Sequence, residues 1–324
     1  MRRYVYRGVK DSSFRLQLPL VFLGAAVVLG LSVPSATAQD EPTAARPPLG
    51  KEAYDLLTSF YDYDRDIPLE ARVVEKQDLP NCTREKIVFR VRDSLVVGYL
   101  GIPKTGSPPY PCVLLLHGIT DKKEGWWEQD NFISGGNMTN ALLKDGFAVL
   151  SPDAPYHGER TFENRFESAW TMVQKKHMSR LRDVVVQAVI ECRRAIDYLE
   201  TRPEIEAGRI GVVGYSLGGI ETFALTALDS RVKSSVACVA SSAFLDQLGT
   251  GPGILPSSFA AALRDRPFLM LMGRNDEYCD AASAQRLYET IPGSKKNLIF
   301  YESGHSLPVN YVTEAVKWLQ DGLK

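Results

Sequence analysis

Residues 208–219 read GRIGVVGYSLGG, and this stretch decides the fold. The β-rich run GRIGVV leads into the pentapeptide GYSLG (214–218), and an apolar helical pattern, GIETFALTAL (219–228), follows it. In a GxSxG turn the glycines stand where a side chain would clash with a sharp strand-to-helix turn, and the serine hydroxyl is left exposed. The sequence therefore predicts a strand-turn-helix unit that presents Ser216 as a nucleophile.

Strand and helix patterns alternate on both sides of this unit. The runs at residues 86–91 and 95–102 are joined by a short turn, which predicts a hairpin. CVLLLHG (112–118) is a continuous apolar run, which is typical of a strand covered on both faces. This alternation predicts an α/β fold with a mostly parallel central sheet flanked by helices. Further predicted strands are 147–152, 232–240, 266–273 and 296–303, with a long helix at 180–200.

Two side chains downstream of Ser216 are candidates to complete a catalytic triad. His305, in YESGH (301–305), follows the predicted strand that starts at residue 296 and is the predicted general base. Asp276, in GRNDE (273–277), follows the preceding strand and is predicted to orient the imidazole. Both lie where the carboxyl ends of strands line the binding crevice of such a sheet. The less favoured candidates are Glu277, Asp280 and Glu302 for the acid, and His117, His157 and His177 for the base.

Two backbone amides are predicted to stabilise the oxyanion, each worth about 3–4 kcal/mol. One is the amide of Leu217, at the N-terminus of the helix that follows the nucleophile, where the helix dipole favours negative charge. The other is the amide of Ile119, in the loop after CVLLLHG. His117 is then expected to shape this loop, and Gly118 to let it turn tightly.

The motifs together resemble the α/β-hydrolase superfamily over residues 86–324. They are HG after an apolar strand, GYSLGG, a GRND turn and a late GH, which give the order Ser, Asp, His. SPDAPYHGER (151–160) and the long helix before GYSLGG are most similar to dienelactone-hydrolase-like esterases and their acyl-peptidase relatives. The resemblance implies a serine hydrolase without a metal or organic cofactor. The chain departs from dienelactone hydrolases proper, which use a cysteine nucleophile, and it lacks the HGGG oxyanion motif of hormone-sensitive-lipase-like enzymes.

Composition excludes several other classes of protein. The 324 residues include 38 Lys and Arg and 39 Asp and Glu, a formal net charge of −1 that offers no bulk attraction to nucleic acid. No CxxC or Cys/His cluster has the spacing of metal ligands, so no metal is expected. The disulfide pairing and the oligomeric state stay open. The five cysteines are Cys82, Cys112, Cys192, Cys238 and Cys279.

The N-terminus has the pattern of a signal peptide over residues 1–38. Basic residues precede a mostly apolar run at 18–33, and the small-residue stretch SATA (35–38) follows. The run is too short for a membrane-spanning helix, so we expect cleavage after Ala38, export to the periplasm or medium, and no stable membrane span afterwards. Residues 39–85 are expected to be a linker and an N-terminal extension packed on the core, and residues 86–324 the catalytic domain.

Two aromatic-rich segments are expected to cover the site. Trp126 and Trp127 lie in the first, and Trp170 lies in the second, residues 161–178, a predicted short cap. Their side chains are predicted to form apolar walls of the substrate pocket, because such pockets are mostly apolar. The alternative for each aromatic residue is ordinary packing onto the core.

Three functional hypotheses follow from the sequence. The favoured one is an exported serine esterase that cleaves small-molecule carboxylic esters through an acyl-enzyme. The second is an acyl-aminoacyl or dipeptidyl-type serine peptidase. The third is a catalytically idle α/β-hydrolase fold used for binding, since a fold alone does not establish a function.

Overall fold

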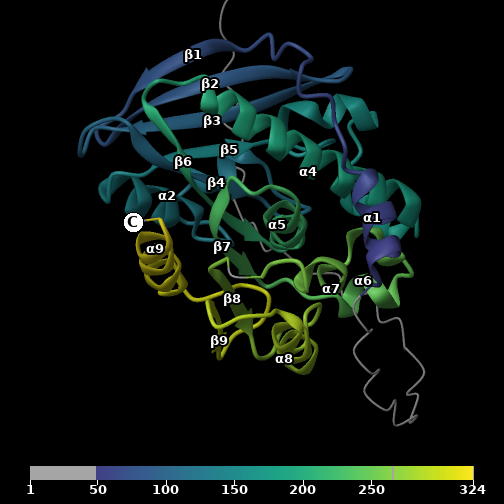
Figure 1. The fold of residues 1–324 in the computed structure, drawn as a ribbon. Coiled ribbons are helices and arrows are strands. Elements are labelled where there is room, and N and C mark those ends of the chain that lie inside the picture. The colour runs from purple at the N-terminus through teal and green to yellow at the C-terminus, as the bar shows by residue number, and fades with distance from the viewer. Residues whose placement is uncertain (1–48, 265, 324) are drawn as a thin grey trace, which may run out of the picture. The chain divides into compact units, whose positions relative to one another are not determined.

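A nine-stranded sheet forms the centre of the chain (Figure 1). The structure, a computed structural model, describes residues 49–264 and 266–323, so the predicted signal peptide lies outside the described residues. The strand order is β1-β2-β3-β5-β4-β6-β7-β8-β9. The strands are β1 (Arg72–Asp78), β2 (Cys82–Val91), β3 (Ser94–Pro103), β4 (Tyr110–Leu116), β5 (Ala148–Pro152), β6 (Ile205–Tyr215), β7 (Val232–Cys238), β8 (Phe268–Gly273) and β9 (Lys296–Tyr301).

The sheet is antiparallel at one edge and parallel elsewhere. Strands β1, β2 and β3 form an antiparallel meander, and β3 pairs antiparallel with β5. From β5 through β4 to β9 every neighbouring pair is parallel. This confirms the predicted α/β-hydrolase architecture, and it places the carboxyl ends of six parallel strands along one edge of the sheet.

Side chains of the central strands alternate between two cores, one on each face of the sheet. In β4, Leu114 and Leu116 belong to one core, whereas Val113 and Leu115 belong to the other. Helices α2 (Gly135–Lys144) and α9 (Tyr311–Gly322) cover the second face. Helices α4 (Met178–Glu200), α5 (Leu217–Leu228), α7 (Pro256–Ala260) and α8 (Ala281–Thr290) cover the first. Burial on both faces explains why these strands read as continuous apolar runs.

The remaining elements are short helices and 3₁₀ turns that lie outside the sheet and the helices named above. They are α1 (Lys51–Ser59), α3 (Trp170–Gln174), α6 (Ala243–Gln247) and the 3₁₀ turns η1 (Lys123–Trp126), η2 (Gly158–Asn164) and η3 (Pro252–Ile254). None of the described helices is both long and apolar enough to cross a membrane.

The N-terminal extension contributes a strand that the sequence did not predict. Strand β1, RVVEKQD, pairs with β2 at the sheet edge, and all seven of its residues are exposed. The alternating charges of β1 disfavour pairing of this sheet edge with another chain. Because no face of the strand is buried, it also lacks the alternation of apolar and polar residues from which a strand is predicted. Strand β2 begins at Cys82, so the expected domain boundary at residue 86 falls inside a strand.

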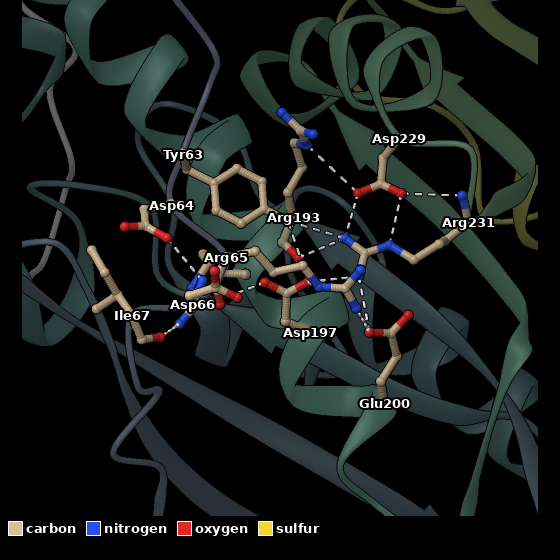
Figure 2. A network of polar contacts seen from close by, with 11 residues as sticks. Tyr63, Asp64, Arg65, Asp66, Ile67, Arg193, Asp197, Glu200, Asp229 and Arg231 are labelled. Carbon is tan, nitrogen blue, oxygen red and sulfur yellow. Dashed lines mark hydrogen bonds and ion pairs between the residues drawn. The ribbon is translucent and has the colours of Figure 1, made fainter.

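A network of charged side chains holds residues 61–67 of the extension against α4 (Figure 2). The guanidinium of Arg194 donates to the carbonyls of Arg65 (3.0 Å) and Ile67 (2.5 Å). Arg231, just beyond α5, donates to Asp197 on α4 (2.6 Å) and to Asp229 (2.6 Å). The network therefore joins the extension, α4 and the turn that follows the nucleophile helix.

The carboxylates of this network are buried and depend on the arginines. Burial alone would raise the pKa of Asp229, but hydrogen bonds and charge from Arg231, with the charge of Arg193, lower it overall. Asp197 is also buried, with 5% of its surface exposed. Asp229 stays charged in the fold because Arg231 lies beside it.

Replacing Arg231 tests how much this network contributes to the free energy of unfolding. Arg231→Ala should lower the free energy of unfolding by about 3 kcal/mol, because removing one partner leaves buried charge uncompensated. Urea unfolding at pH 7 measures the effect. Lys233→Ala is the control: Lys233 is exposed, and among the described residues its ammonium donates only to the Ser230 carbonyl, so the change should stay within about 0.5 kcal/mol. Equal unfolding midpoints for both variants would contradict the assignment.

Candidate active site

Ser216 lies in a strained turn between β6 and α5. Its backbone has φ +55° and ψ −111°, a conformation that L-residues rarely adopt and that costs about 1–3 kcal/mol. A Cβ on Gly214 would lie 2.0 Å from the Gly218 carbonyl oxygen, and one on Gly218 would lie 2.2 Å from the Leu116 carbonyl oxygen. Only glycine fits at either position, so the GxSxG spacing is a steric requirement of this turn.

The side chains of Ser216, His305 and Asp276 form one hydrogen-bonded chain. His305 Nε2 lies 2.9 Å from Ser216 Oγ, and its Nδ1 lies 2.8 Å from Asp276 Oδ2. The other carboxylate oxygen, Oδ1, accepts from the amides of Tyr278 (2.9 Å) and Cys279 (3.0 Å). Asp276 is thus fixed in place, and in the tautomer protonated on Nδ1 the imidazole can accept the serine proton.

The predicted oxyanion amides lie beside this chain. Leu217 is the first residue of α5, so its amide has no partner within the helix. Gly218 N donates to the His117 carbonyl (3.0 Å), which joins the loop after β4 to the nucleophile turn. A Cβ on Gly118 would lie 3.5 Å from Ser216 Cβ, so Ile119 follows a residue that packs closely against the serine. Among the described residues, neither the Ile119 nor the Leu217 amide donates a hydrogen bond.

Two buried histidines hold the loop that carries Ile119. His117 Nε2 accepts from the Ala154 amide (3.1 Å), so its Nδ1 carries the proton and donates to the Gly118 carbonyl (2.9 Å). His157 Nε2 lies 2.8 Å from the Ile119 carbonyl oxygen. Burial lowers the pKa of both rings; that of His157, which the His117 ring lowers further, falls to about 4. The His117 imidazole is therefore neutral at pH 7, whereas both ring nitrogens of His157 face carbonyl oxygens, those of Pro155 and Ile119, at 2.8 Å.

The buried carboxylate of Asp153 links Lys123 to Glu159 by hydrogen bonds. It accepts from the Lys123 amide (2.9 Å), the Lys123 ammonium (2.8 Å) and the Glu159 amide (3.1 Å). Asp153 and Lys123 are both fully buried. The motif SPDAPYHGER thus positions the loop that carries Ile119, a role that the sequence did not reveal because it depends on contacts with residues 117–123.

A cavity of about 530 Å³ opens next to Ser216 and His305. Trp170 lines it, as expected for the segment 161–178, which forms η2 and α3 rather than one continuous helical cap. Most of the other lining side chains are apolar or aromatic, and they come from helices α4, α5 and α6 as well as from loops. Among them are Ile119, Phe132, Leu181, Leu217, Ile220, Phe244, Leu245 and Tyr278.

Trp126 and Trp127 do not line this cavity, and the expectation that they form its walls is corrected. Trp126 is fully buried in the core beneath α2, where its carbonyl accepts from the Thr139 hydroxyl. Trp127 donates from its indole to Ser151 Oγ (3.0 Å) and packs edge-on against Tyr99. The Trp127 side chain therefore faces β3 and β5 of the sheet.

Asp276, Cys279 and His305 also bring metal-ligand atom types within 4.8 Å of one another. The Asp276 and His305 atoms already bind each other, and the Cys279 thiol donates to the Val239 carbonyl (3.2 Å). Burial raises the pKa of this thiol to about 12, so it stays protonated. A metal ion would need the thiolate, and the hydrogen-bonded triad accounts for the cluster.

The sheet order and the nucleophile turn define an α/β-hydrolase, and the comparisons give its family. Residues 96–311 match the family model described as "Dienelactone hydrolase family", so the chain belongs to that family. The chain is accordingly a carboxylic-ester hydrolase, as the resemblance in the sequence implied.

Individual relatives agree in fold and length. The chain is similar to "Putative esterase YitV" of Bacillus subtilis (strain 168), with 25% identity over 243 residues, 65% of this chain and 88% of that protein. Among solved structures, acetyl xylan esterase 1 from Thermoanaerobacterium sp. JW/SL YS485 matches with a TM-score of 0.67 and 17% identity over 87% of this chain and 96% of that one. Acetyl xylan esterase from Paenibacillus sp. R4 gives 0.64 and 19%, over 86% and 98%.

Glu221, in α5, is a buried carboxyl group, 2% exposed. Its Oε1 has no hydrogen-bond partner among the described residues. Neighbouring Glu191 is itself fully engaged with Arg160 (2.5 and 2.9 Å). Burial, followed by the charge of Glu191, raises the pKa of Glu221 well above its usual range. Glu221 is therefore neutral in the fold, whereas it ionises in the unfolded chain above about pH 4.3.

This difference gives stability a definite dependence on pH. Because the folded pKa is raised, the native state binds the extra proton, and stability is lost as pH rises from the unfolded pKa toward the folded one. Glu221→Gln removes that loss and should stabilise the protein by about 1–2 kcal/mol at pH 8, with a smaller gain at pH 4. Unfolding by urea at the two pH values measures it; a gain independent of pH would contradict the neutral state.

Proposed function

We propose that the protein is an exported serine esterase that acts through Ser216, His305 and Asp276. The observation that carries the proposal is the unbroken contact from Ser216 Oγ through the His305 imidazole to Asp276, with spacings of 2.9 and 2.8 Å. It lies at the mouth of a largely apolar cavity. The esterase names of the relatives and structural neighbours support an ester as the substrate.

In the proposed reaction Ser216 Oγ attacks the ester carbonyl carbon while His305 Nε2 takes the serine proton. The carbonyl oxygen becomes an oxyanion that accepts from the Ile119 and Leu217 amides. The tetrahedral intermediate collapses, the alkoxide leaves with the proton from His305, and an acyl-enzyme forms. Water then attacks the acyl carbon with His305 again as the base, and Ser216 is regenerated as the acid product leaves. Asp276 stabilises the imidazolium in both steps.

One experiment tests this function against the two alternatives. The wild-type protein should be labelled at Ser216 by a fluorophosphonate and should hydrolyse short p-nitrophenyl esters but not aminoacyl anilides. Ser216→Ala should lose the label and at least about 10⁴-fold in kcat/KM, while its urea midpoint shows that it is folded. Anilide turnover would favour the peptidase, and the absence of labelling the binding protein. Ester turnover retained in Ser216→Ala would refute the proposed nucleophile.

Export is the second part of the proposal and rests on residues 1–38, with the basic start, apolar run and SATA stretch of a signal peptide. Expression of the full chain in a bacterial host should yield a periplasmic or secreted protein whose first residue is Gln39. N-terminal sequencing of the fractionated protein measures this. Ala36→Leu with Ala38→Leu should block cleavage, because the processing site requires small residues. A full-length chain found only in the cytoplasm would contradict export.

A further inference from the structure

The cavity next to Ser216 is lined both by aromatic side chains and by carboxylates. We propose that the site selects uncharged or cationic esters that carry a large apolar group, and discriminates against esters that carry a carboxylate. This inference names a substrate class for the proposed esterase and therefore rests on the proposed function.

The apolar part of the lining includes an aromatic wall that starts at the His305 imidazole. The Tyr278 ring lies 5.0 Å from that of His305, centre to centre, in a T-shaped arrangement. Phe244 lies 5.3 Å from Tyr278, and Trp170 stacks on Phe244 at 6.5 Å. Because the wall begins at the group that protonates the leaving alcohol, an apolar part of the ester can lie along it while the carbonyl carbon faces Ser216.

The size of the cavity favours a bulky ester group. Its volume of about 530 Å³ lies in the range of pockets that enclose whole drug-sized ligands. A two-carbon acyl group would leave most of this space unfilled. The faces of these aromatic rings also attract cations, so a positively charged ester group can lie against them.

The carboxylate side chains give the lining of the cavity a negative charge. Asp121, Glu128 and Glu277 line the cavity, and no Lys or Arg is among the described residues that do so. The carboxylates of Glu128 and Glu277 are exposed and form no ion pair with any described residue. Lys122, beside Asp121, does not line the cavity.

Carboxylates of one sign around a cleft with apolar walls concentrate a negative potential inside it. An ester that carries its own carboxylate must enter against this potential, with no lining cation to pair with. A neutral ester of the same shape meets no such barrier, and a cationic one is attracted. The resulting selectivity is electrostatic, so it must weaken as salt is added.

Three butyrate esters of equal bulk test the inference: 3-(butyryloxy)benzamide, 3-(butyryloxy)benzoate and 3-(butyryloxy)-N,N,N-trimethylanilinium. Each kcat/KM is divided by the rate constant for hydroxide hydrolysis of the same ester, which corrects for the leaving group. At about 20 mM salt we expect the benzoate to fall at least about tenfold below the benzamide, and the anilinium to equal or exceed it. At about 0.5 M salt the gap between benzoate and benzamide should narrow several-fold.

Charge-neutral variants identify the source of the selectivity. Glu128→Gln combined with Glu277→Gln should narrow the gap in normalised kcat/KM between the benzamide and the benzoate at least about threefold at low salt. The matched control is Asp130→Asn, which removes an exposed carboxylate that does not line the cavity and should leave the gap unchanged. Equal normalised rates for the benzoate and benzamide would overturn the inference, as would a gap that survives in the double variant or narrows equally in Asp130→Asn.

The same assays separate this inference from the proposed function. Turnover of the benzamide that is abolished in Ser216→Ala, together with no selectivity by charge, refutes only the substrate class. Turnover that persists in Ser216→Ala, or no turnover of any of the three esters, refutes the proposed function and the inference with it.

Discussion

The close contact between the nucleophile turn and the neighbouring strand is the constraint on which the site depends. Gly218 lies so near the Leu116 carbonyl that a single added carbon would meet it at 2.2 Å. This contact holds the N-terminus of α5 against the end of β4, and the Gly218 amide then bonds to the His117 carbonyl. The strained Ser216 conformation is thus held from both sides by packing in the sheet, and the two predicted oxyanion amides are brought together by the same contact.

The rest of the site is held by buried polar groups rather than by apolar packing alone. Asp153 collects three hydrogen bonds at the end of β5, and His157, four residues further on, reaches the carbonyl of Ile119. A buried carboxylate is tolerated there because the Lys123 ammonium and two amides replace its lost hydration. The loop that carries Ile119 is therefore held in place by buried polar contacts, although Ile119 itself is partly exposed.

Much of this arrangement could be predicted from the sequence, for identifiable reasons. The parallel strands are buried on both faces and read as apolar runs, and the GxSxG turn has a steric signature, so the fold and the position of Ser216 followed from local patterns. Chain order placed Asp276 and His305 after neighbouring strands, and the measured distances join them to Ser216. Strand β1 could not be predicted, because no face of it is buried. The packing of Trp126 and the role of His157 were also hidden, since each depends on partners distant in sequence.

All five cysteines are buried as free thiols, and none is cross-linked. Burial raises the pKa of Cys82 to about 11 and that of Cys279 to about 12. No disulfide therefore contributes to holding these elements together, and the packing of the two cores shields every cysteine side chain from solvent.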